Sequence, residues 1–163
     1  MADTRVQLEV EDSVRENWMR QRFGQPFYRN RLRLSSGGVF DFDAVSEDKS
    51  IIASISTSSA RTSGGKHAVG KLMKLRSDML FLLLVEGISR KYLILTEKSM
   101  HELCLKEQEN GRAPKDIQFL LAEITSELEQ RLVHARHAAS KEVSPRAIEE
   151  ALPDELLLDS KQE

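Results

Sequence analysis

The stretch GVFDFDAVSEDKSIIASISTS, residues 38–58, decides the fold of this chain. Alternating side chains over residues 39–45 predict one strand, and the β-branched run over 51–57 predicts a second. The polar segment 47–50 between them predicts a hairpin loop. The stretch therefore places two neighbouring antiparallel strands at the start of the sheet.

Acidic and hydroxyl side chains occupy defined faces of these two strands. Period-two geometry places Phe42 and Ala44 on one face of the first strand and Asp43 on the other. In the second strand it places Ser54 and Ser56 together. If the strands pair as a hairpin, we expect Asp43 and the two serines to converge.

Outward from the hairpin, helical and strand-like patterns alternate. Apolar residues at 6, 10, 14 and 18 predict an amphipathic helix that ends at Gly24. The other predicted strands span residues 27–34, 79–85 and 91–96. The other predicted helices span 66–77, 96–107 with Thr96 as N-cap, and 114–139. This order predicts an α/β fold with a mixed sheet flanked by helices.

Composition limits the class of protein. The 163 residues predict one domain over residues 1–139, followed by an acidic tail over 140–163 with a short helix that starts at Ser144-Pro145. The single cysteine, Cys104, excludes an intrachain disulfide and is expected to pack in the core. The longest apolar run is too short to cross a bilayer, so we expect a cytoplasmic protein without a membrane partner.

The element order and the acidic second strand resemble the restriction-endonuclease-like fold of the PD-(D/E)XK nuclease superfamily. In that family an aspartate near the end of the second strand is followed, after a hairpin, by an acid-x-lysine motif on the third. A glutamate on the first helix often completes the metal site. The resemblance covers roughly residues 10–96. It implies that Asp43 is the metal-binding aspartate, with Glu11 or Glu16 as the helix carboxylate and Mg²⁺ as the cofactor of an active enzyme.

The chain departs from this family at the acid-x-lysine positions, which are Ser54 and Ser56. Phosphodiester hydrolysis needs charge stabilisation at the phosphoryl group and an activated water, and neutral serines supply neither the ligand nor the cation. We therefore expect a catalytically degenerate nuclease fold. The alternative is an active magnesium-dependent endonuclease in which Lys66 or Lys71 replaces the missing lysine.

Charge is distributed unevenly along the chain. Residues 1–78 hold 13 basic and 10 acidic side chains for a net charge of +3, and residues 79–163 hold 11 and 16 for −5. The basic half suits a phosphate-bearing partner, although a charged surface is also what any soluble domain shows. The candidate nucleic-acid-binding residues are Arg29, Arg31, Arg33, Arg61, Lys66, Lys71 and Lys74.

The tail supports a third interpretation. Residues 140–163 carry a net charge of −4 and include three consecutive leucines at 156–158. Such a segment is typical of a docking region, so a protein partner or a regulatory subunit role through the C-terminal helices is the other alternative.

Overall fold

The chain folds around a five-stranded mixed sheet in the order β1-β2-β3-β4-β5. Pairing is antiparallel between the first three strands and parallel among the last three. The computed structural model describes residues 4–62 and 64–142. Its strands are β1 (Phe27–Arg33), β2 (Val39–Ser46), β3 (Ile51–Ser56), β4 (Arg90–Leu95) and β5 (Ile117–Leu121). The expected mixed α/β sheet is confirmed.

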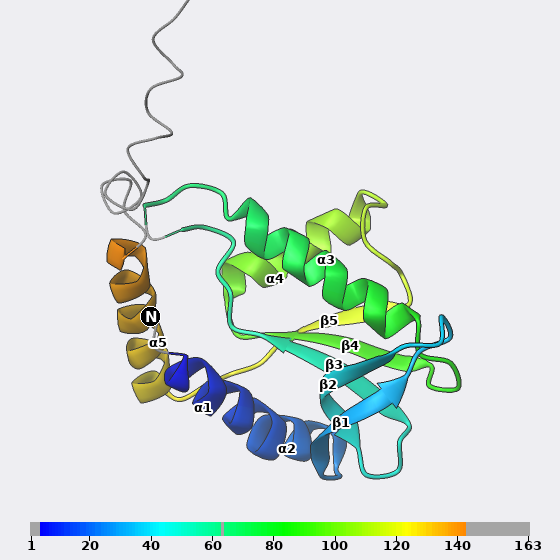
Figure 1. Cartoon of the computed structure of the whole chain (residues 1–163). Coiled ribbons are helices and arrows are strands. Elements are labelled where there is room, and N and C mark those ends of the chain that lie inside the picture. Colours follow the sequence, from blue (N-terminus) through cyan, green and yellow to red (C-terminus); the bar gives the residue numbers. More distant parts are fainter. Residues whose placement is uncertain (1–3, 63, 143–163) are drawn as a thin grey trace, which may run out of the picture.

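Helices cover both faces of this sheet (Figure 1). One face packs against the first helical segment and the last helix, and the other face packs against two helices between strands. The first layer holds α1 (Arg5–Ser13), the π-helical segment η1 (Val14–Met19), α2 (Arg20–Phe23) and α5 (Ser126–Glu142). The second holds α3 (Val69–Leu83) and α4 (Lys98–Glu109). Two apolar layers therefore stabilise the central strands from both sides.

The prediction of a strand over residues 79–85 is wrong, because residues 79–83 form the last part of α3 and the helix ends at Leu83. Met79 and Leu82 are buried against the sheet, while Leu80 and Leu83 stay exposed on the helix flank. When the flank of a helix is apolar as well as its buried face, seven residues of its sequence show no 3.6-residue period. Periodicity therefore cannot distinguish such a helix from a buried strand. The same error ended the predicted helix 66–77 too early, and α3 starts only at Val69.

The prediction of one helix over residues 114–139 is also wrong. Residues 117–121 form strand β5 beside β4, and the helix begins only at Ser126. Ile117 and Phe119 are buried and Gln118 between them is exposed, which is strand alternation. The apolar spacing fits both the helix period and the strand period, and pairing with β4 decides between them.

The prediction of Thr96 as the N-cap is wrong as well, because α4 starts after Glu97 and the Thr96 hydroxyl makes no hydrogen bond within the described chain.

A β-bulge interrupts the pairing of β1 with β2. Tyr28 lies opposite Val45 and Asn30 lies opposite Phe42, so Asp43 and Ala44 together face Arg29 alone. The extra residue shifts the side-chain alternation. Phe42 packs with the α3 layer, whereas Ala44 packs with the α1 layer, so the expectation that they share one face is wrong.

The edge of the sheet at β5 is covered by side chains of α4. Nε2 of Gln108 donates to the carbonyl of Ile117 at 2.8 Å, and Nε2 of His101 lies 3.2 Å from the carbonyl of Phe119. Edge strands that keep partners for their backbone groups pair less readily with other chains.

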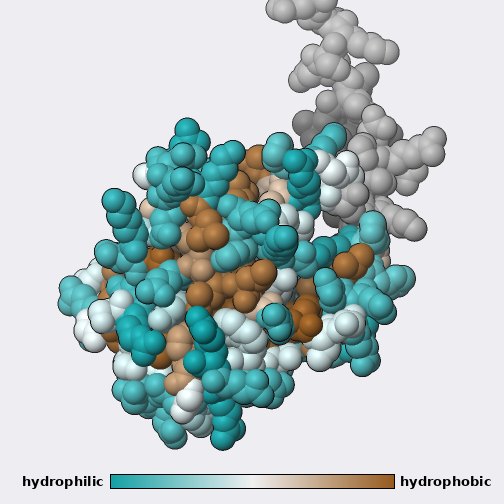
Figure 2. Space-filling view, turned by 180° about the vertical axis from the view of Figure 1, so that it is seen from behind, coloured by the Kyte–Doolittle hydropathy of each residue, from teal (hydrophilic) through white to brown (hydrophobic). Residues whose placement is uncertain are grey.

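Figure 2 shows apolar groups gathered near the middle of the face opposite to that of Figure 1, with polar side chains around them.

Two further expectations concern the core and the tail. Cys104 is fully buried and packs against α3 and the sheet, as expected. Helix α5 continues through the predicted domain boundary at residue 140, and the predicted tail helix and the leucines at 156–158 lie outside the described residues. In the described part of the chain, no helix is long and apolar enough to cross a membrane.

Candidate functional site

The sheet opens between β2 and β3 just beyond the hairpin. Only two positions of β2, Ala44 and Val45, are in register with β3. The position before them carries a side-chain contact instead, because Oδ2 of Asp43 accepts a hydrogen bond from the backbone N–H of Ile55 at 2.8 Å. The strands therefore separate at Asp43, and its carboxylate lies at the point of separation.

Helix α1 brings a second carboxylate to this point. Glu11 lies one position after the buried Val10, and it is itself partly buried. Burial raises the pKa of Glu11, and the nearby negative charge of Asp43 raises it further. The two carboxylates therefore interact unfavourably when both are ionised.

Helix α3 brings a third carboxylate, together with a lysine. Burial raises the pKa of Asp78, and the charge of Asp43 adds to the rise. Nζ of Lys74 lies 3.3 Å from the Asp78 carboxylate, one helical turn away, and its charge opposes both that shift and the shift of Glu11. We call Glu11, Asp43, Lys74 and Asp78 the separation site.

An arginine lies behind the separation site in the π-helical segment. The side chain of Arg15 is buried, and Nη1 donates to the backbone carbonyl of Asp43 at 3.1 Å. Its Nη2 group binds the carboxylate of Asp12. Sequence reasoning missed Arg15, and the only available signal was a charged residue next to the apolar stripe at Val14.

The two serines at the acid-x-lysine positions are buried. Ser54 is 2% exposed and Ser56 is 7% exposed. The Ser56 hydroxyl accepts a hydrogen bond from the backbone N–H of Ser58 at 3.2 Å, which fixes the chain after β3. Both positions therefore contribute packing and a turn contact, and neither contributes charge.

The donor set for a magnesium ion is incomplete. Magnesium binds hard oxygen ligands, most often carboxylates together with water and substrate phosphate. Among residues 4–62 and 64–142, no group of three or more His, Cys, Asp or Glu side chains is arranged to hold a metal ion. One carboxylate oxygen of Asp43 already accepts a backbone hydrogen bond. These residues do not by themselves fit a resident magnesium ion.

The three candidate arginines of β1 differ in their partners. Arg31 forms a bidentate pair with Asp41 on β2, at 2.9 and 3.1 Å. This contact lowers the pKa of Asp41. Arg29 and Arg33 are exposed, and neither forms an ion pair with another described side chain. Only Arg29 and Arg33 keep a guanidinium that is not already bound to a carboxylate.

The loop after β3 folds back on itself. Arg61 pairs as an isolated bridge with His67, and its Nη1 group donates to the carbonyl of Gly65 at 3.0 Å. The backbone of Lys66 accepts a hydrogen bond from the N–H of Thr62 at 2.7 Å, while the side chain of Lys66 is exposed. These contacts therefore join Arg61 and Lys66 to the loop itself.

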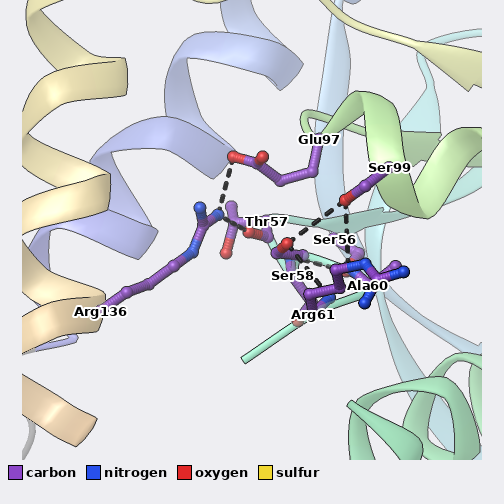
Figure 3. A network of polar contacts seen from close by, with 9 residues as sticks. Ser56, Thr57, Ser58, Ala60, Arg61, Glu97, Ser99 and Arg136 are labelled. Carbon is purple, nitrogen blue, oxygen red and sulfur yellow. Dashed lines mark hydrogen bonds and ion pairs between the residues drawn. The ribbon is translucent and has the colours of Figure 1, made fainter. Parts of the chain in front are cut away.

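A second polar cluster ties the ends of β3 and β4 to α5 (Figure 3). Arg136 extends from α5, pairs with Glu97 at 2.9 Å and donates to the backbone carbonyl of Thr57. The Ser59 and Ser99 hydroxyls lie 3.2 Å apart beside this pair. We call Thr57, Ser59, Glu97, Ser99 and Arg136 the Arg136 cluster.

The candidate lysines of α3 belong to different clusters. Burial lowers the pKa of Lys71, and the charge of Arg136 lowers it further, so Lys71 lies near the Arg136 cluster. Lys74 is the lysine of α3 whose charge acts on Glu11. The helix period separates the two, since residues three apart differ in direction by about 60°.

Comparison with protein-family models, with curated proteins and with solved structures finds no match to this chain. The α/β architecture therefore stands on the sheet and its helices alone. Function has to be argued from the residues of the sites described above.

Proposed function

We propose that this protein has a nuclease-like architecture without nuclease catalysis and binds nucleic acid through the basic half of its chain. The observation that carries this proposal is the pair of buried neutral serines, Ser54 and Ser56, beside an Asp43 carboxylate that accepts a backbone hydrogen bond. Two of the three groups that the resemblance requires are replaced by packing contacts.

The chemistry of phosphodiester cleavage explains why this replacement matters. The transition state carries negative charge that a metal ion and a cation have to stabilise, and water has to be activated in line with the leaving group. Ser54 and Ser56 provide no charge. Of the groups that the resemblance implies, only the carboxylates of Asp43 and Glu11 remain.

Binding needs less than catalysis does. A protein gains affinity for nucleic acid by neutralising phosphates with Lys and Arg side chains, and each such contact releases counterions. Arg29, Arg33 and Lys66 are exposed and carry charge that no described carboxylate neutralises within an ion pair. These residues support a phosphate-binding surface.

The test is a fluorescence anisotropy titration of the full chain with labelled single-stranded and double-stranded oligonucleotides at several salt concentrations. We expect the affinity to fall linearly with the logarithm of salt concentration. The double variant Arg33→Glu, Lys66→Glu lowers the affinity for all sequences, whereas Lys115→Glu in the acidic half serves as the matched control. Absence of binding at every salt concentration contradicts the proposal.

A magnesium-dependent nuclease is the second candidate, because one observation favours it. Lys74 lies within electrostatic reach of Glu11, and Glu11 within reach of Asp43, so a lysine accompanies the two carboxylates after all. It differs from Lys66 and Lys71, which the sequence suggests. Incubation with plasmid and oligonucleotide in Mg²⁺ or Mn²⁺ decides between the candidates, and cleavage that Asp43→Asn and Lys74→Met both abolish establishes the enzyme.

A further inference from the structure

A polar hollow lies between the first helical layer and the outer strand β1. It is the place where η1 ends, α2 turns at Gly24 and the chain enters β1. Gly24 adopts φ = 72°, which caps α2 and lets the chain reverse tightly. The hollow is lined by Arg15, Glu16, Asn17, Arg20, Pro26, Phe27, Tyr28 and Arg29.

The shape of this hollow follows from the π-helical segment. One residue more per turn places Val14, Arg15 and Met19 on the buried side of η1, and leaves Glu16, Asn17 and Arg20 on the exposed side. Segments with π-helical geometry occur often at functional sites, because the extra residue costs stability and is retained for a reason.

The charge of the hollow is mainly positive and largely unpaired. Arg20 and Arg29 are exposed, and the side chain of neither forms an ion pair with another described residue. Glu16 is the only acidic residue in the lining. Arg31, two residues after Arg29 on β1, is by contrast neutralised by Asp41 on the neighbouring strand β2.

An aromatic ring accompanies these guanidinium groups. Tyr28 is 54% exposed although it lies within a strand, because it belongs to the outermost strand and precedes the bulge. An exposed tyrosine on an edge strand offers a π-face to a planar ligand. Guanidinium groups match phosphate geometry, and an aromatic ring stacks with an unpaired base, so the two together fit single-stranded nucleic acid.

We propose that this hollow binds a segment of single-stranded nucleic acid, with phosphates at Arg20 and Arg29 and a base stacked on Tyr28. This inference rests on the proposed nucleic-acid-binding function and names the strand class and the residues. A duplex keeps its bases inside the helix and cannot use Tyr28 in this way. Single strands therefore bind more tightly than duplexes of equal length.

The experiment uses the full chain and fluorescein-labelled twelve-residue oligonucleotides of thymidine and uridine, with a mixed-sequence duplex as the third probe. Tyr28→Ala lowers the single-strand affinity about 5- to 100-fold, since stacking contributes roughly 1–3 kcal/mol per base. Tyr28→Phe keeps the ring and retains the affinity. The double variant Arg20→Glu, Arg29→Glu lowers the single-strand affinity and reduces the slope of the logarithm of affinity against the logarithm of salt concentration.

Each outcome decides a separate claim. If Arg33→Glu, Lys66→Glu weakens binding while Tyr28→Ala and the Arg20, Arg29 variant do not, the hollow is excluded and the general binding function stands. If the duplex binds as tightly as the single strands, stacking on Tyr28 is excluded. If the unaltered protein binds none of the probes, both proposals fail. Unfolding midpoints and circular dichroism of each variant exclude a loss of fold as the cause.

Discussion

The separation site and the Arg136 cluster contain similar polar groups but differ in how those groups are paired. In the Arg136 cluster, Arg136 meets a carboxylate and a backbone carbonyl at once. In the separation site, Glu11 and Asp78 both have raised pKa values, and Asp43 contributes to both shifts. Mutually satisfied charges stabilise a fold, whereas carboxylates gathered near one another cost stability when they are ionised.

The largest expected effect comes from restoring the missing motif. Ser54→Glu with Ser56→Lys places two charges at positions that are 2% and 7% exposed, so we expect the free energy of unfolding to fall by about 3–5 kcal/mol. Urea denaturation measures it, with Ser54→Ala and Ser56→Ala as the matched controls. A double variant within about 1 kcal/mol of the unaltered protein would show that the separation site still has room for the catalytic groups.

The next effect tests the Arg136 cluster. Arg136→Ala removes a charged contact to Glu97 and one to the Thr57 carbonyl, and both partners are mostly shielded from water. We expect a loss of about 2 kcal/mol. Arg131→Ala on the same helix removes an exposed pair with Glu9 and is expected to cost about 0.5 kcal/mol. Thermal or urea unfolding measures both losses. Equal losses of unfolding free energy in the two variants would contradict the expectation that the shielded pair of Arg136 contributes more than the exposed pair of Arg131.

A smaller effect separates the two roles of Asp43. Asp43→Ala leaves the N–H of Ile55 without its acceptor and costs about 1–2 kcal/mol, whereas Asp43→Asn keeps an acceptor oxygen and costs less. Hydrogen exchange at the Ile55 amide provides a local readout and is expected to accelerate only in the alanine variant. Equal exchange in both variants would indicate that the carboxylate does not hold β3.

The smallest expected effect is a gain in stability rather than a loss. Glu11 has a raised pKa in the folded protein, so the folded state binds its proton more tightly than the unfolded state does. Stability is therefore lost as pH rises from the ordinary glutamate value through the raised one. Glu11→Gln removes this dependence and stabilises the protein at neutral pH by about 0.5–1 kcal/mol.

Denaturation across that pH range measures the difference, with the exposed Glu16→Gln as control. A pH profile that Glu11→Gln leaves unchanged would show that neither burial nor the charge of Asp43 raises the pKa of Glu11. The Glu11→Gln protein also serves in the binding titrations, since a change in oligonucleotide affinity would connect the separation site with the nucleic-acid surface.

Local patterns predicted some elements well and others wrongly, for identifiable reasons. The hairpin over residues 39–56 has clear alternation and a polar loop, and it forms as expected. Residues 79–85 and 117–121 are apolar at spacings that fit both helix and strand. In each case the neighbouring element decides: the sheet lies under α3, and β4 offers a parallel edge to β5.

The candidate site was predictable only in part. The family resemblance implied that Asp43 acts together with a carboxylate of the first helix, Glu11 or Glu16, and the charge of Asp43 contributes to the raised pKa of Glu11. Arg15 and Asp78 gave no comparable signal, because their roles depend on the π-helical turn and on the direction of α3. The sequence indicated Lys66 or Lys71, and not Lys74, as the replacement lysine, whereas the direction of α3 brings the charge of Lys74 toward Glu11 and that of Lys71 toward Arg136.

The sequence by itself determined the α/β class, the hairpin, the neutral serines and the uneven charge, because each depends on residue identity or on short-range periodicity. Only the tertiary structure decided the separation of β2 from β3, the ion pair of Lys74 with Asp78 near Glu11, and the hollow at Tyr28. These features join residues that are distant in the chain, and packing of helices on a twisted sheet sets their distances.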